Sequence, residues 1–311
     1  MVVFMKKGLK IFLVSAIAVL LLVAIVIVSF FAVYPMSPDV EIKSAQERIE
    51  NKGEILVASY NTAAPWGNLL EGTYTTRRMH LWAQQINNTL PDSLGVQEIN
   101  SFWVSGLEEL LPQYAYYGIK RGGDENEQKS EMNGIYYLKD KFNLLESDTF
   151  WISETPEIES KYENAGCYRI CSYVVLENKL TGFTYIHMNT HFDNSSVEAQ
   201  NLGGKLVCEY AERLSQKYKN TPIVITGDFN QYSDGESVKM LDSKGYINAN
   251  GGVKEPTYHG WGENSHTEPI DYIFVKGFTA SDYRVHSNTG EKSDISDHYM
   301  ISAECKTQSA K

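Results

Sequence analysis

Residues 221–230, Thr-Pro-Ile-Val-Ile-Thr-Gly-Asp-Phe-Asn, form an apolar, β-branched run that stops at two polar side chains. The run has the length and composition of a strand buried on both faces, which requires a sheet covered by other layers. Such a strand brings Asp228 and Asn230 to its carboxyl end, where α/β sheets usually bind ligands. Side chains two residues apart on an extended chain point the same way. The pattern predicts an α/β fold with a site at this strand end.

The N-terminal segment differs from the rest of the chain. Residues 11–33 are apolar apart from two serines, and about 20 such residues suffice to cross a bilayer. Lys6, Lys7 and Lys10 precede this run and no basic cluster follows it directly, so we expect residues 1–10 in the cytoplasm and the remaining chain outside. A secretory signal peptide is the alternative, but its apolar core is normally about 7 to 15 residues long. We therefore expect a retained, single-pass cell-membrane anchor.

The remaining chain divides into a linker, a body and a tail. Residues 34–51 mix Pro, Ser and alternating charges, which suits a short stalk with a helical turn at 45–50. Residues 52–306 suffice for one large α/β domain, and 307–311 form a tail. The net charge of −11 argues against a surface built to hold nucleic acid, although a nuclease with a local site and a metal stays possible. The sequence does not indicate an obligate protein partner.

The four cysteines are too few for a disulfide scaffold in a domain of this size. An exported location would permit a bridge between Cys167 and Cys171, and buried free thiols fit the sequence at least as well. The two residues lack zinc-finger spacing.

Apolar strand-like runs alternate with amphipathic helical patterns along the body. A capping box at Ser195 and Glu198 marks the start of the third helix. We expect strands at 54–60, 93–97, 133–138, 142–152, 169–176, 184–190, 221–226, 270–275 and 299–304, and helices at 75–88, 102–111, 199–214 and 235–242.

Polar side chains stand at the ends of these runs, where a sheet exposes functional groups. Each one alone has a structural explanation, because Asn and Asp form turns and a histidine is often a satisfied structural group. Their co-occurrence favours a common site. The set comprises Asn61, Glu98, His191, Asp193, Asp228, Asn230, Asp271, Asp297 and His298.

These residue types match the needs of a metal-assisted phosphoester hydrolase. Glu98 offers the oxygen ligand that Mg²⁺ prefers. Asp228 is placed to orient or deprotonate the attacking water, while Asn230 and Asn61 can fix the geometry of water and phosphate.

Histidines supply the second half of this chemistry. His298 paired with Asp271 can remain cationic against phosphoryl oxygens, and His191 is the second histidine. Zinc is the minor alternative, since the sequence lacks an HExxH motif and a His/Cys cluster.

Six motifs follow one another in the order found in a known family, and together they are far more specific than any one alone. The chain resembles the endonuclease/exonuclease/phosphatase superfamily, which is deoxyribonuclease-I-like. The resemblance implies a four-layer α/β/β/α sandwich of two packed mixed sheets, here preceded by one transmembrane helix, and dependence on Mg²⁺ or Mn²⁺. The motifs are Ala-Ser-Tyr-Asn at 58–61, Gly-Val-Gln-Glu at 95–98, Asn-Thr-His-Phe-Asp at 189–193, Gly-Asp-Phe-Asn at 227–230, Ile-Asp-Tyr-Ile at 270–273 and Ser-Asp-His at 296–298.

The resemblance also implies residue roles. Glu98 would ligate the metal, with Asp297 and Asn61 beside it. Asp228 and Asn230 would align the nucleophile. The remaining roles are support of His298 by Asp271 and contact of His191 with the scissile phosphate. Glu131 would support the first histidine, Arg169 would face phosphate, and Asp193 would contact or support the substrate.

We therefore expect hydrolysis of a phosphodiester or phosphomonoester by an activated water, at an extracytoplasmic, membrane-tethered site. The substrate stays open between DNA, RNA, phospholipid, inositol phosphate and sugar phosphodiester. The alternative is a non-catalytic surface binding module on the same scaffold, which loss of Glu98, Asp228 or His298 would have indicated. Five aromatic residues are expected in loops, where they either stack on a substrate or anchor the loop: Trp66, Trp103, Tyr258, His259 and Trp261.

Overall fold

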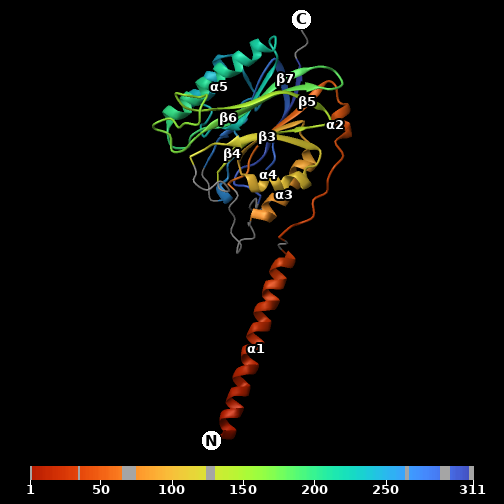
Figure 1. Ribbon diagram of the computed structural model, residues 1–311, viewed down its shortest axis with the longest axis vertical. Coiled ribbons are helices and arrows are strands. Elements are labelled where there is room, and N and C mark those ends of the chain that lie inside the picture. Colours follow the sequence, from red (N-terminus) through yellow and green to blue (C-terminus); the bar gives the residue numbers. More distant parts are fainter. Residues whose placement is uncertain are drawn as a thin grey trace.

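The computed structural model describes residues 2–33, 36–64, 75–123, 130–262, 266–287 and 295–307. Helix α1 (Val2–Val33) extends away from a body that holds the other elements (Figure 1). Residues 10–32 of this helix are long and apolar enough to cross a membrane, and none of that segment is buried; a signal sequence would show the same properties. Trp66 and residues 308–311 of the expected tail lie outside the described residues.

The first of two six-stranded sheets has the order β11-β12-β1-β2-β4-β3. Strands β1 and β2 run parallel, and every other pair in this sheet is antiparallel, so the sheet is mixed. Its strands are β1 (Glu54–Asn61), β2 (Ser93–Ile99), β3 (Tyr114–Lys120), β4 (Met132–Leu138), β11 (Phe278–Val285) and β12 (Ile301–Thr307).

The second sheet has the order β5-β6-β7-β8-β10-β9. It is also mixed, because β7 and β8 run parallel and the other pairs are antiparallel. Its strands are β5 (Phe142–Trp151), β6 (Ile170–Asn178), β7 (Thr184–His191), β8 (Ile223–Asp228), β9 (Ile247–Asn248) and β10 (Asp271–Lys276).

Helices cover the outer face of each sheet. Helices α3 (Thr75–Thr89) and α4 (Ser101–Leu110) pack on the first sheet through side chains such as Trp82 and Trp103. Helices α5 (Val197–Lys217) and α6 (Glu236–Ser243) pack on the second through Leu214 and Leu241. Tyr185 of the second sheet is buried in the core of the first, so the two sheets pack face to face. The expected four-layer sandwich is confirmed.

Helices α4 and α5 each begin with a side-chain cap. Asn100 accepts a hydrogen bond from Trp103 N at 3.0 Å and Ser196 accepts one from Ala199 N at 3.2 Å. The capping box expected at Ser195 is therefore wrong by one residue. The Ser195 hydroxyl instead donates a hydrogen bond to the Asp193 carboxylate, within the turn that precedes α5.

Other expectations also need correction. Trp103 is not a loop residue, since it is fully buried in α4. Strands β3, β9 and β11 have no counterpart among the predicted strands, and β12 begins two residues later than expected. Cys167 and Cys171 are free thiols, so the open question of a bridge is answered in favour of free cysteines.

Candidate active site

Neighbouring strands of the second sheet place three polar residues in one row. His191 ends β7 beside Asp228, which ends β8, and Asp271 opens β10 on the other side of Asp228. Residues paired across adjacent strands point to the same face and lie about 5 Å apart. The strand register alone therefore aligns an imidazole and two carboxylates at one sheet edge.

The first sheet contributes to the same place. The side-chain amide of Asn61, at the end of β1, donates to Oε1 of Glu98 at 3.1 Å and to Oδ2 of Asp228 at 3.2 Å. Its own Oδ1 accepts a hydrogen bond from Ala63 N at 2.8 Å, which fixes the amide orientation. Asn61 thus joins the two sheets at the site.

Two of these residues adopt a backbone conformation that is uncommon for non-glycine residues. Glu98 has φ 58° and Asn230 has φ 50°. At Glu98 the register between β2 and β4 shifts between Val96 and Ile99, as in a β-bulge, which turns a side chain away from the regular strand alternation. Such strain is commonly found where a side chain must be aimed at a site.

A cavity of about 490 Å³ opens at this edge. Asn61 and Asp271 stand behind its wall and contact lining residues. Eight of the predicted site residues line it directly: Glu98, Glu131, Arg169, His191, Asp228, Asn230, Asp297 and His298.

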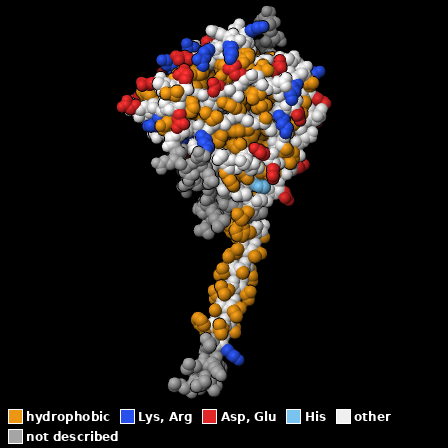
Figure 2. Space-filling view, in the orientation of Figure 1, with side chains coloured by type: hydrophobic (Ala, Val, Ile, Leu, Met, Phe, Trp, Pro, Cys, Tyr) orange, Lys and Arg blue, Asp and Glu red, His pale blue; other side chains and the backbone are white. Residues whose placement is uncertain are grey.

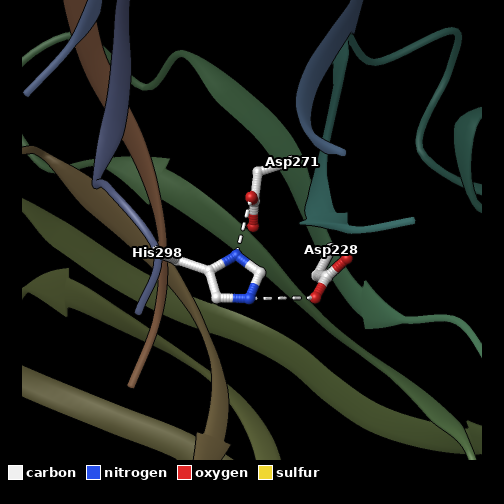
Figure 3. A group of neighbouring side chains, drawn as sticks. All are labelled: Asp228, Asp271 and His298. Atoms are coloured by element: carbon white, nitrogen blue, oxygen red, sulfur yellow. Dashed lines mark hydrogen bonds and ion pairs between the residues drawn. The ribbon is translucent and has the colours of Figure 1, made fainter. Parts of the chain in front are cut away.

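His298 stands between two carboxylates, as Figure 3 shows. Its Nδ1 lies 2.8 Å from Oδ2 of Asp271 and its Nε2 lies 3.6 Å from Oδ2 of Asp228. Burial lowers the pKa of His298, but Asp271 and then Asp228 outweigh it and raise the pKa to about 10. The ring is therefore a cation at neutral pH, and it can donate from both nitrogens.

A small network of hydrogen bonds supports the ion pair between Asp271 and His298. Thr257 Oγ1 donates to Oδ2 of Asp271 at 2.6 Å and accepts the Asp271 backbone N–H at 3.0 Å. Ser296 Oγ accepts the backbone N–H of His298 at 3.1 Å and donates to the carbonyl of Asn61 at 2.7 Å. The Thr257 hydroxyl thus fixes the Asp271 side chain, and the Ser296 hydroxyl fixes the backbone of His298.

Asp228 and His191 occupy the floor of the cavity. Burial, together with the charge of Asp271, raises the pKa of Asp228 to about 7. Nε2 of His191 lies 3.4 Å from Oδ2 of Asp228. Burial and the charges of Arg169, Arg121 and His298 hold the pKa of His191 well below its usual value, so this histidine is neutral.

The residues present fit a divalent cation. Burial raises the pKa of Asp297, and the neighbouring Glu98 charge adds to this. Oδ1 of Asp297 is buried and accepts no hydrogen bond from the described residues. Carboxylates that lack hydrogen-bond donors are stabilised by a bound cation.

A second grouping could offer metal ligands. Asp228, Asp271 and His298 each bring one ligand atom within 4.8 Å of the others. A metal, however, requires a neutral imidazole, and both ring nitrogens of His298 face carboxylates. We therefore favour Glu98 and Asp297, with Asn61 beside them, as the metal side of the cavity.

Basic side chains also line the cavity. Nη1 of Arg121 pairs with Oε2 of Glu131 at 2.6 Å, and both residues line the cavity. Arg169 also lines it, and its buried Nε lies 3.8 Å from Oδ2 of Asp193, an ion pair longer than a hydrogen bond. Glu131 thus contacts an arginine, whereas the resemblance implied support of a histidine.

Asp193 and Asn230 are fixed by local hydrogen bonds. Asp193 accepts bonds from Ser195 N and Ser196 N at 3.0 Å each, and from Gly166 N at 3.0 Å, so it holds the start of α5 against the 166–167 loop. The side-chain amide of Asn230 donates to Phe192 O at 3.1 Å, and the backbone N–H of Asn230 donates to Oδ1 of Asp228 at 2.9 Å.

Sequence reasoning missed several residues of the site. Arg121 follows β3, a strand whose alternating Tyr-Ala-Tyr-Tyr pattern was the available signal. Thr257 carried no signal, because only the fold brings its hydroxyl to Asp271, whereas Ser296 stood in the Ser-Asp-His motif without a role of its own. Of the expected loop aromatics, Tyr258 lines the cavity.

This arrangement defines a class. The model of the endonuclease/exonuclease/phosphatase family matches residues 58–298. This range includes all eleven predicted site residues. The chain belongs to this family. Among curated proteins, no sequence matches it significantly.

Solved structures give particular relatives. An endonuclease/exonuclease/phosphatase family protein from Bacteroides thetaiotaomicron is 31% identical, with a TM-score of 0.75, over 82% of this chain and 96% of that one. The mannosyl-6-phosphatase of the same species is 32% identical, with a TM-score of 0.75, over 81% and 99%. The human Nocturnin catalytic domain with bound sulfate, at 18% identity and a TM-score of 0.66 over 82% and 95%, shares the fold.

Proposed function

We propose that this protein is a Mg²⁺-dependent phosphoester hydrolase, held in the membrane by α1 with its body outside the cytoplasm. The observation that carries the proposal is the bridge from Asn61 to Glu98 and Asp228, which unites both sheets at one cavity. Membership of the endonuclease/exonuclease/phosphatase family supports metal-dependent phosphoester hydrolysis in general.

The residues of the second sheet would activate the nucleophile. Asp228, with a pKa raised by burial to about 7, is suited to orient a water and take its proton. Asn230, whose N–H holds Oδ1 of Asp228, keeps that carboxylate in position. The cationic His298 would donate a hydrogen bond from Nε2 to a phosphoryl oxygen as negative charge develops there.

Glu98 and Asp297 would hold the cation, with Asn61 orienting Glu98. When bound there, Mg²⁺ or Mn²⁺ supplies a Lewis acid for a phosphoryl oxygen. Arg121 and Arg169, which also line the cavity, would bind the non-reacting phosphoryl oxygens, because guanidinium groups match phosphate geometry.

Two observations bear on the substrate class. The relative that is a mannosyl-6-phosphatase makes a phosphomonoester the first substrate to test. On the face of the body seen in Figure 2, acidic and basic side chains are interspersed, and the whole chain carries −11 net charge, which does not favour a long nucleic acid.

The membrane assignment rests on α1 and on the lysines before it. Apolar side chains cover most of the face of the helix that Figure 2 shows. The positive-inside tendency places Lys6, Lys7 and Lys10 in the cytoplasm. Protease digestion of intact cells tests this, since only an outward body would be cleaved.

The test of activity uses the full-length chain in detergent, with mannose 6-phosphate, phospholipids, inositol phosphates, DNA and RNA as substrates. We expect phosphate or nucleotide release with Mg²⁺ or Mn²⁺, and none with chelator or in Asp228→Asn. If the wild-type protein hydrolyses none of these with either metal, the proposal fails. Chelator-insensitive binding of a surface ligand without turnover would support the binding-module alternative.

A further inference from the structure

The segment predicted as a stalk is docked along helix α3. Nδ1 of His80 donates to Pro38 O at 2.8 Å, and Oε1 of Gln84 accepts the Glu41 N–H at 2.7 Å. One turn further, Oδ1 of Asn87 accepts the Lys43 N–H at 3.3 Å. The segment therefore runs alongside α3 in the same direction, hydrogen-bonded at successive turns of the helix.

A largely buried network of ion pairs holds the C-terminal end of this segment against the body. Helix α2 (Gln46–Glu50) carries Arg48, which pairs with Asp92 and, at 2.9 Å, with Glu304. Asp92 also pairs with Lys141 at 2.7 Å, and neither side chain of that pair is exposed. Detaching Arg48 from this network would leave the buried Asp92 with one partner fewer, which costs free energy. We therefore treat the docked segment as part of the body.

The start of α3 belongs to the active-site end of the body. Arg78, half a turn before His80, donates to Ala64 O at 3.0 Å and to Ile295 O at 2.9 Å. Ala64 follows the site residue Asn61 by three positions, and Ile295 precedes Asp297 by two. Pro38 consequently lies at the active-site end.

The opposite end of the body lies where Arg48 is anchored. Asp92, its partner, immediately precedes β2, whose far end carries Glu98. Seven residues of strand separate the two ends by about 23 Å. The docked segment thus runs from the active-site end to the far end before the chain enters β1.

The membrane anchor must therefore leave the body at the active-site end. Helix α1 ends at Val33, and the five residues from there to Pro38 can span at most about 18 Å. In Figure 1, α1 meets the body near the start of α3, away from the C-terminus.

We propose that the docked linker holds the catalytic cavity at the membrane-facing end of the body, and that the substrate is a phosphoester carried by a lipid headgroup of that membrane. This inference rests on the proposed anchoring and hydrolysis. The headgroup layer is about 5 to 8 Å deep on each side of the bilayer core, so a cavity held this close to the anchor can meet its phosphates.

The orientation is tested on the full-length chain in phosphatidylcholine nanodiscs that contain an acceptor-labelled lipid. A donor dye is attached in Val197→Cys, at the start of α5, or in Leu180→Cys, in the turn between β6 and β7; both side chains are exposed. Strand β7 separates the two positions by about 25 Å. Unsubstituted protein, labelled in parallel, gives the background from the native cysteines.

We expect stronger energy transfer from position 197 than from position 180. Equal transfer, or stronger transfer from 180, overturns the orientation. Absence of transfer at both positions shows that α1 does not anchor the protein, and overturns the inference together with the proposed anchoring.

The substrate is tested by comparing phosphatidic acid in the same nanodisc with glycerol 3-phosphate in solution, two monoesters of the same chemistry. A rigid helical spacer of roughly 20 residues, inserted after Met36, would lift the body by about 30 Å. We expect hydrolysis of phosphatidic acid to fall by roughly tenfold or more, while hydrolysis of glycerol 3-phosphate stays unchanged.

The outcomes separate the two levels of the proposal. Unchanged phosphatidic acid hydrolysis in the spacer variant, or wild-type turnover of glycerol 3-phosphate alone, overturns the lipid-headgroup substrate and leaves the hydrolase intact. Turnover of neither monoester, nor of any substrate in the wider set above, means that the proposed hydrolase itself is wrong.

Discussion

His298 and Asp271 form a buried ion pair, with Nδ1 of the ring 2.8 Å from Oδ2 of the carboxylate. Asp271 opens β10 of the second sheet, whereas His298 lies in the segment just before β12 of the first. Because Asp271 also accepts the Thr257 hydroxyl, its position is fixed from two sides. The pair therefore presents a preorganised cation, through Nε2 of His298, toward the cavity.

Asp271→Asn should remove most of that cation at neutral pH. The amide keeps the size of the side chain but lacks the charge that outweighs the burial of His298. We expect kcat to fall by roughly 10²-fold with the fold retained, measured by steady-state kinetics and circular dichroism. Asp282→Asn, an exposed change of the same chemistry, should leave kcat unaltered; equal kcat in both variants would refute the assigned role.

Asp228→Asn should have the larger effect on catalysis. This residue lies between His191 and Asp271 in the row across the sheet, and an amide cannot take a proton from water. We expect kcat to fall by roughly 10³-fold or more. The exposed Asp234→Asn serves as control, and a kcat for Asp228→Asn within a few-fold of that control would show that another residue is the base.

Glu98→Gln should weaken metal binding more than substrate binding. Glu98 is aimed into the cavity by a positive φ and a strand irregularity, and an amide oxygen is a poorer ligand than a carboxylate. We expect chelator-treated enzyme to regain activity with Mg²⁺, and the variant to need roughly tenfold more metal. Isothermal titration with Mn²⁺ measures this directly, and an unchanged affinity relative to the exposed Glu109→Gln would exclude Glu98 as a ligand.

Arg169→Gln should impair phosphate binding. The buried guanidinium lines the cavity, and its Nε lies 3.8 Å from Oδ2 of Asp193, an ion pair longer than a hydrogen bond, so its charge can act on a phosphate bound there. We expect KM to rise roughly tenfold, with a smaller change in kcat. Arg284→Gln, on an exposed part of β11, is the matched control, and the same KM in both would show that Arg169 does not bind the substrate.

The sequence was sufficient to predict the central strands and the site at their ends. In β8 the buried run stops at Asp228, so periodicity and polarity mark the same boundary. The β7 and β10 partners follow the same rule at His191 and Asp271. Residues at the ends of buried strands are therefore recognisable from one sequence, because apolar side chains give way there abruptly to polar ones.

The edge strands were missed for a related reason. Strand β11 alternates between exposed and partly buried residues and β3 is mostly half-buried, so neither has the continuous apolar run of a central strand. The docking of the linker was also out of reach, since it depends on single hydrogen bonds from His80 and Gln84. Local pattern does not encode such pairings between distant segments.

His187 should make folding stability depend on pH. It is buried between the sheets, with its ring nitrogens 2.9 Å from Ser93 Oγ and from Thr226 Oγ1, and burial lowers its pKa from 6.5 to about 3. Between these values the unfolded chain binds a proton that the folded chain does not. The free energy of unfolding should therefore be constant with respect to this group above pH 6.5 and fall by about 1.4 kcal/mol per pH unit below it. Urea unfolding across this range should show that slope reduced in His187→Gln; an identical slope in both proteins would show that His187 does not titrate on unfolding.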